Sequence, residues 1–265
     1  MKIAVIILNY NSSADCTKCI SFLKRQEDAD LDIVIVDNGS HAEDVAHLRA
    51  LCETEGCVLL PCTQNRGYSA GNNTGLRYAA DKGYRYALIA NPDMKFPQTD
   101  YISKLVGRMD TDRRIAVAGT DITGPDGLHQ NPMKPEGNWR NSFDWIKALF
   151  RKKKTDAYRF IDNHQTSHYC HKLGGCCMMV NLAFIRKIGY LDEYPFLYCE
   201  EAILSKQVER SGWRMYYSAT SQAIHWHINK DKGDPAGRFR EWRRSRIYFI
   251  EQYSDDSRLL SLIHI

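Results

Sequence analysis

Acidic side chains stand in this sequence where secondary structure elements are predicted to end or begin. Asp37 follows the apolar run "IVIV" and Asp93 comes shortly after "ALIA", and both runs predict buried strands. Glu200 and Glu201 open a predicted helix much later in the chain. A carboxylate at a strand end can bind a divalent cation that neutralises a diphosphate, and a second, metal-free carboxylate can deprotonate a hydroxyl. These groups are the minimal set for direct displacement at a sugar carbon.

Other familiar chemistries lack their motifs. A dinucleotide-binding turn needs G-x-G-x-x-G after the first strand, but here that turn reads "NYNS" at residues 9–12. The chain has neither a G-x-x-x-x-G-K-S/T phosphate loop nor a G-x-S-x-G nucleophile turn. Cys16 and Cys19 form a CxxC without a second pair at zinc spacing. We therefore expect the nine cysteines to be reduced, with a structural zinc site as the lesser alternative.

The first half of the chain alternates predicted strands and helices. Strands are expected at residues 2–8, 32–36, 57–60, 86–90 and 115–119, and helices at 13–26, 43–55 and within 67–82. Such alternation is typical of an α/β fold with a mostly parallel central sheet and helices on both faces. Ligands bind these sheets beyond the C-terminal strand ends, where Tyr10, Asp37 and Asp93 lie. We expect these three side chains to converge on one crevice.

The second half of the chain is less regular. Residues 120–138 predict a hairpin or loop, residues 141–168 an insertion, and residues 171–180 a strand containing Gly174 and Gly175. A glycine pair inside a strand indicates a bulge or the close approach of a ligand. Short helices are expected at 182–188 and 200–211, short strands at 215–218 and 223–227, and a long helix at 235–253.

Positive charge is concentrated in two runs, although the net charge is only +4. Residues 151–154 read "RKKK", and residues 238–246 contain five arginines interleaved with Phe239 and Trp242. A solvated face is the ordinary meaning of such runs. A surface for anionic lipid or nucleic acid is the alternative, and composition does not choose between them.

Seven segments, in order along almost the whole chain, resemble one enzyme family. They are "VIILNYNS", "IVIVDNGS", "NRGYSAGNNTGL", "ANPDM", "GGCCMMV", "FLYCEEAIL" and "AIHWH". The chain is similar to glycosyltransferase family 2, the inverting enzymes of the GT-A fold, and especially to its rhamnosyltransferase-like branch. The resemblance implies a GT-A fold with a smaller C-terminal elaboration on the acceptor side. It also implies a nucleotide-sugar donor, Mg²⁺ or Mn²⁺ as cofactor, and a glycan or lipid-linked glycan acceptor.

The resemblance also implies roles for individual residues. Asp93 stands at the metal position of the family's Asp-x-Asp, His225 at a histidine that often completes the metal or diphosphate site, and Glu201 at the general base. The side chains expected near the donor are Asn9, Tyr10, Asp37, Asn65, Gly67, Asn73 and Asn91, and those expected near the acceptor are Gly174, Gly175 and Tyr198. Neighbouring helical residues diverge by roughly 100°, so only one of Glu200 and Glu201 should face the acceptor.

Several of these residues have plainer interpretations. Asp37 could belong to an ordinary turn, the two glutamates could be first-turn acids, and His225 or His227 could be a hydrogen-bonded core histidine, His227 being the weaker candidate. Gly67 could serve helix packing instead of the donor. Asn91 replaces the first acid of the metal motif and Ile203 stands where many relatives have another acid. A catalytically silent nucleotide-sugar-binding homologue is therefore one alternative function, and a nucleic-acid-binding protein is a weaker one.

Length and composition favour a single soluble domain. The chain has 265 residues, of which 43% are hydrophobic and 26% charged. We expect one domain over 1–265, with a nucleotide-sugar-binding half at 1–120, an acceptor and catalytic half at 121–234 and a basic-aromatic helix within 235–265. No apolar run is long enough to span a bilayer and a strand-like run follows Met1 directly. The expected location is the cytoplasm, with peripheral attachment to the inner membrane face and no binding to nucleic acid.

Overall fold

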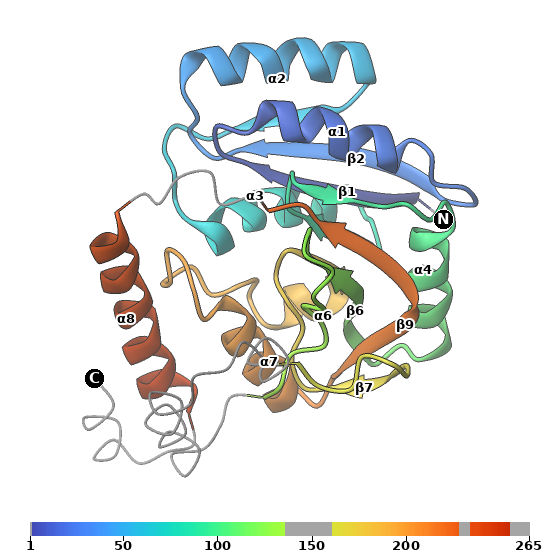
Figure 1. Cartoon of the computed structure of the whole chain (residues 1–265), viewed down its shortest axis with the longest axis vertical. Helices are drawn as coiled ribbons and strands as arrows, with labels where there is room; N and C mark the ends of the chain where they lie inside the picture. The colour runs from blue at the N-terminus through green and yellow to red at the C-terminus, as the bar shows by residue number, and fades with distance from the viewer. Residues whose placement is uncertain (1, 136–160, 228–233, 255–265) are drawn as a thin grey trace.

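The structure is a computed structural model that describes residues 2–135, 161–227 and 234–254 (Figure 1). The described residues form a nine-stranded sheet in the order β3-β2-β1-β4-β8-β6-β9-β5, with β7 paired to β9. The basic run at 151–154 and most of the predicted insertion lie outside the described residues.

The first four strands confirm the predicted parallel pattern. They are β1 (Lys2–Asn9), β2 (Asp30–Asp37), β3 (Val58–Pro61) and β4 (Tyr86–Ala90), and the pairs β2–β3, β1–β2 and β1–β4 are all parallel. Asn9 lies opposite Asp37, and Ile7 lies opposite Ala90. The C-terminal ends of β2, β1 and β4 therefore meet at one edge of the sheet, as the alternation of elements predicts.

Helices cover both faces of this sheet (Figure 1). One face packs against α1 (Ser13–Leu23), α2 (Ala42–Glu55) and α4 (Tyr101–Thr111). The other packs against α3 (Tyr68–Asp81), α6 (Leu182–Lys187) and α7 (Glu200–Arg210). Helix α4 was not predicted, although Ile102, Leu105 and Met109 have helical spacing and are buried.

The sheet is mixed, because β8 (Cys177–Asn181) runs antiparallel to both β4 and β6 (Ile115–Thr123). The strand expected at 171–180 is wrong in its first part. A short strand, β7 (His168–Cys170), precedes it, and Gly174 and Gly175 lie in a turn before β8. The turn forms because both glycine amides donate to side chains, Asn131 and Glu201, instead of to a neighbouring strand.

The two short strands expected at 215–218 and 223–227 are one long strand, β9 (Arg214–His225). It pairs in parallel with β6 through a register shift at Thr120 and Asp121, which accounts for the apparent break in the sequence pattern. The far end of β9 pairs with β5 (Met94–Lys95), which was not predicted, and Met94 lies opposite His225. This pairing carries the end of β9 to the turn that holds Asp93.

Helix α8 (Pro235–Gln252) stands at the edge of the molecule (Figure 1). Phe249 in its C-terminal half is buried with Ala202 and Ile203 of α7. Among the described helices, none combines the length and apolar character needed to cross a membrane. All nine cysteines lie within the described residues, and none of them forms a disulfide bond there.

Candidate active site

The Asp93 turn begins where the fully buried strand β4 ends. Asn91 N–H donates to the carbonyl of Cys176 at 2.8 Å, and Met94 N–H donates to Asn91 O at 3.2 Å, which closes a tight turn through Pro92 and Asp93. Pro92 has a fixed φ and biases Asn91 away from helix. Trp226 N–H donates to Asp93 O at 2.9 Å. The turn is therefore held by β4, by β5 and by the end of β9.

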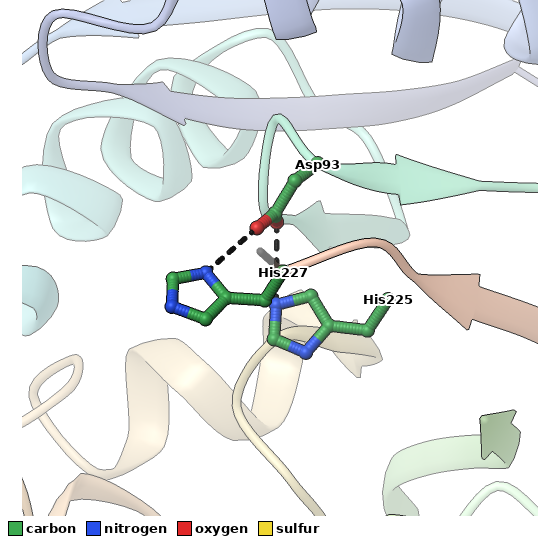
Figure 2. Close-up of side chains that lie close together, drawn as sticks. All are labelled: Asp93, His225 and His227. Atoms are coloured by element: carbon green, nitrogen blue, oxygen red, sulfur yellow. Dashed lines mark hydrogen bonds and ion pairs between the residues drawn. The ribbon is translucent and has the colours of Figure 1, made fainter. Parts of the chain in front are cut away.

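Asp93, His225 and His227 form a compact cluster (Figure 2). His225 Nε2 lies 3.2 Å from Asp93 Oδ1, and His227 Nδ1 lies 3.1 Å from Asp93 Oδ2. One potential ligand atom from each residue lies within 4.8 Å of the others. The side chains of Asp93 and His225 are mostly buried, whereas that of His227 is 57% exposed. The cluster thus opens to solvent on the His227 side.

Two atoms of this cluster indicate that it is suited to a cation. Asp93 Oδ1 and His225 Nε2 face each other, are buried, and form no hydrogen bond with any part of the chain that the structure describes. Burial alone would raise the pKa of Asp93, but the two imidazoles beside it lower that pKa from its usual value. A carboxylate kept ionised beside imidazole nitrogens is a ligand set that divalent metals accept. The residues present therefore fit a divalent cation.

Glu201 is joined to the Asp93 turn through the Gly175 turn. Gly175 N–H donates to Glu201 Oε1 at 3.2 Å, and the next residue, Cys176, accepts the Asn91 N–H. The hydroxyl of Tyr68 donates to Gly175 O at 2.5 Å. A Cβ at position 175 would lie 3.1 Å from that hydroxyl and 3.3 Å from Glu201 Oε1. A side chain at 175 would therefore require Tyr68 or Glu201 to shift by a few tenths of an ångström, and the predicted approach of a ligand to this glycine stays a prediction.

Glu200 occupies a different environment from Glu201. Its Oε2 is buried without a hydrogen-bond partner among the described residues, and so is Oε1 of Gln207, which borders the same small cavity. Burial, and next the charge of Glu201, raise the pKa of Glu200 to about 8. Glu200 therefore keeps its proton to a higher pH than an isolated glutamate would.

The segment before α7 has an unusual backbone. Tyr198 and Cys199 adopt positive φ values of 73° and 65°, which is uncommon for residues other than glycine. Phe196 O accepts the Tyr68 N–H at 3.0 Å, and a Cβ at Gly67 would lie 2.3 Å from that carbonyl oxygen. Gly67 thus allows α3 to approach this segment, which supports the packing interpretation of that glycine. Tyr198 immediately precedes Cys199, the N-cap of the helix that carries Glu201.

The strand ends predicted to contact the donor lie side by side, but two of their side chains are engaged with each other. Asn9 and Asp37 are 0% and 1% exposed, and Asn9 Nδ2 donates to Asp37 Oδ1 at 3.3 Å and to Asp44 Oδ2 at 2.8 Å. Tyr10 is 49% exposed at the same edge. The contacts of Asn9, Tyr10 and Asp37 with a donor stay predictions.

The remaining predicted donor residues are held by neighbouring parts of the chain. Asn65 Oδ1 accepts from Asn38 Nδ2 and from Gly67 N–H. Both side-chain groups of Asn73 are bound, Nδ2 to Leu191 O and Glu193 Oε1, and Oδ1 to Leu191 N–H. None of these contacts places Asn73 at the Asp93 cluster, and its role at the donor stays a prediction.

His227 is closer to the centre of the site than the sequence indicates, and Tyr68 was not predicted to contact it. His227 follows the last residue of β9 by two positions, but its distance to Asp93 equals that of His225 within 0.1 Å. The spacing "HWH" was the available signal, because alternate residues of an extended segment point to the same side. Nothing in the local sequence indicates that Tyr68 meets Gly175, since the two are 107 positions apart.

Comparison with known proteins identifies the family. The family described as "Glycosyl transferase family 2" matches residues 4–188 of this chain, which include the Asp93 turn and the Gly175 turn. The chain belongs to glycosyl transferase family 2. The resemblance seen in the seven sequence segments is thereby confirmed.

Two relatives of this family 2 chain have informative names. The chain is 28% identical over 225 residues to "Low-salt glycan biosynthesis hexosyltransferase Agl10" of Haloferax volcanii, covering 84% of this chain and 66% of that protein. It is 23% identical over 257 residues to "N-acetylglucosaminyl-diphospho-decaprenol L-rhamnosyltransferase" of Mycobacterium tuberculosis, covering 93% of this chain and 83% of that protein.

A solved structure shows the fold of this family 2 chain. The crystal structure of GalNAc-T7 with UDP, GalNAc and Mn²⁺ superposes with a TM-score of 0.66 at 15% identity. It covers 99% of this chain, which spans 55% of the GalNAc-T7 chain. The GT-A fold expected from the sequence is confirmed.

Proposed function

We propose that this chain is an inverting, metal-dependent glycosyltransferase that moves a sugar from a nucleoside-diphosphate sugar to a hydroxyl of a glycan or lipid-linked glycan. The observation that carries the proposal is the Asp93, His225 and His227 cluster, joined through the Gly175 turn to Glu201. The names of the two relatives favour a hexose donor, such as dTDP-rhamnose or a UDP-sugar, and a role in cell-surface polysaccharide synthesis.

Each element of the site has one task in this reaction. Bound at Asp93, His225 and His227, Mg²⁺ or Mn²⁺ would neutralise the charge of the diphosphate leaving group. Glu201 takes the proton of the acceptor hydroxyl, whose oxygen attacks the anomeric carbon as the carbon–oxygen bond to the diphosphate breaks. The attack comes from the face opposite the leaving group, so the anomeric centre inverts. The Gly175 N–H holds Glu201 Oε1 in place for this proton transfer.

The test is donor turnover in paired variants. The purified protein is incubated with dTDP-rhamnose and with several UDP-sugars, with and without Mn²⁺, and release of nucleoside diphosphate is followed. Glu201→Gln should keep donor affinity and lose on the order of a hundredfold or more in turnover, because a base acts in the transition state. Normal turnover in Glu201→Gln with an inactive Glu200→Gln would assign the base to Glu200 instead.

A different result would indicate a silent homologue. If the protein binds nucleotide-sugars in a thermal shift assay but releases no nucleoside diphosphate with any donor and acceptor tested, the transfer proposal is wrong. The replacement of the first metal-motif acid by Asn91 would then be the first position to examine, by restoring an aspartate there.

The position of α8 supports a further part of this proposal, peripheral docking on an anionic membrane. Phe239 and Trp242 are 59% and 43% exposed, and their rings stack at 5.8 Å. Four arginines of the same half of the helix are exposed: Arg238, Arg240, Arg243 and Arg244. Exposed aromatics beside arginines are the composition of an interfacial helix.

A second exposed apolar segment lies next to this half of α8. Tyr194, Phe196 and Leu197 are 48%, 40% and 38% exposed. Arg244 lies over the Tyr194 ring at 5.2 Å, and Ser245 Oγ donates to Leu197 O at 2.7 Å. The segment leads directly into Glu200 and Glu201, so a docked membrane would lie near the acceptor side.

Vesicle co-sedimentation tests the docking. Each basic side chain near an anionic surface contributes about 1 kcal/mol, so replacing Arg240, Arg243 and Arg244 together by Ser should weaken binding on the order of a hundredfold at low salt. The matched control replaces the exposed Arg25, Arg49 and Arg113, which lie outside α8, by Ser. Equal loss in both triple variants, or no binding of the unchanged protein at low salt, would refute the docking surface.

A further inference from the structure

Gln130 contacts the cluster at His225, on the side of the ring that faces away from Asp93. Its Oε1 lies 2.9 Å from Nδ1 of His225, the ring nitrogen that faces away from Asp93. An amide oxygen can only accept, so Nδ1 carries the proton in this contact. In a neutral imidazole, Nε2 then has a free lone pair, and this is the nitrogen 3.2 Å from Asp93 Oδ1.

The backbone around Gln130 is fixed on both sides. Gln130 N–H donates to Ile122 O at 2.7 Å, and the preceding His129 Nδ1 lies 2.6 Å from the buried Asp121 Oδ1. The following residue, Asn131, is fully buried, and its Nδ2 donates to Thr120 O at 3.0 Å. Three consecutive side chains are thus each tied to a different point, which leaves the Gln130 side chain few alternative positions.

The next residue along the chain, Asn131, also reaches the Gly175 turn. Asn131 Oδ1 accepts the Gly174 N–H at 2.8 Å, and the adjacent Gly175 N–H donates to Glu201 Oε1. Adjacent residues, Gln130 and Asn131, therefore support the predicted metal ligand and the turn that holds the predicted base.

We propose that Gln130 is a positioning residue that holds His225 in the Nδ1-protonated tautomer, so that Nε2 is presented to the metal beside Asp93. The inference rests on the proposed function, in which His225 is a metal ligand. Partners of this kind orient ligating histidines, and their loss commonly costs 10–100-fold in metal affinity. No local sequence pattern indicates this role, because Gln130 and His225 are 95 positions apart.

Three variants test the proposal. Gln130→Met keeps the length of the side chain but removes the acceptor, and Gln130→Glu keeps an acceptor. Gln98→Met is the matched control, because Gln98 Oε1 accepts from Gln222 N–H on the same strand, β9, at 2.7 Å without touching a histidine. The tautomer of His225 is measured by long-range ¹H–¹⁵N spectra at alkaline pH, where imidazole is neutral, with the signal assigned by a His225→Gln variant. Mn²⁺ affinity is measured separately by electron paramagnetic resonance.

The expected result is an Nδ1-protonated His225 in the unchanged protein, in Gln130→Glu and in Gln98→Met, and loss of that signature in Gln130→Met. Mn²⁺ affinity should fall about 10–100-fold in Gln130→Met and stay within about threefold in Gln98→Met. An Nε2-protonated His225 in the unchanged protein, or unchanged tautomer and affinity in Gln130→Met, would overturn the proposal while leaving the metal site intact. No Mn²⁺ binding by the unchanged protein would instead overturn the metal site, and the role of Gln130 with it.

Discussion

Replacing Glu200 by Gln should make the stability of the protein less dependent on pH. The Glu200 carboxyl is buried beside Glu201, and its pKa is raised from 4.5 to about 8. A carboxyl with a raised pKa binds its proton more tightly in the folded protein than in the unfolded chain. The folded protein therefore loses stability as pH rises from about 4.5 through about 8. Glutamine has a similar shape but no proton to lose, so it removes this loss.

The structure sets the size of the effect. Each tenfold change in proton affinity corresponds to about 1.4 kcal/mol, so the change in pKa from 4.5 to about 8 gives an upper limit of about 5 kcal/mol above pH 8. Burial is the largest cause of the rise, and the charge of Glu201 supplies the next part. We expect Glu200→Gln to be more stable than the unchanged protein by roughly 2 kcal/mol or more at pH 8.5 and equal to it at pH 4.5.

Urea unfolding followed by circular dichroism at a series of pH values measures this difference. Glu201→Gln is the control, because its amide keeps an acceptor for the Gly175 N–H while removing the charge beside Glu200. In that variant the loss of stability with rising pH should be smaller than in the unchanged protein. A difference between Glu200→Gln and the unchanged protein that does not vary with pH would show that Glu200 does not carry the raised pKa.

Three further predictions concern single positions. Asp93→Ala should abolish Mn²⁺-dependent donor binding in calorimetry and leave the circular dichroism spectrum unchanged, whereas unchanged Mn²⁺-linked affinity would refute the metal assignment. Gly175→Ala should lower turnover on the order of tenfold or more, because the new methyl lies within 3.3 Å of Glu201 Oε1 and misplaces it; normal kinetics would contradict this. Gly67→Ala should lower the free energy of unfolding by about 3 kcal/mol, which is more than the loss expected for the control Gly83→Ala. Both glycines have positive φ, but only at Gly67 would the new methyl meet a backbone atom, Phe196 O, so equal losses would show that this contact is unimportant.

The sequence by itself determined the fold class and which acidic residues follow the predicted strands. The apolar runs that end at Asp37 and shortly before Asp93 predict strands, because buried strands need continuous β-branched and aliphatic side chains. This pattern is local, so it can be recognised without knowing the rest of the fold. The family segments further predicted roles for Glu201 and His225, because a short sequence motif can be recognised without the residues that surround it in the fold. The spans of β1, β4, α3 and α7 were therefore predictable within a few residues.

Only the tertiary structure decided how the second half of the chain meets these strands. Strand β8 pairs antiparallel between β4 and β6, and β9 runs unbroken to β5, because pairing depends on hydrogen-bond partners far away in sequence. The site needs the same information. Asp93 meets His225 and His227 across more than 130 positions, and Gln130 meets His225 across 95. Local sequence sets which side chains are available, but contacts over such separations arise only when the sheet closes and brings the strand ends together.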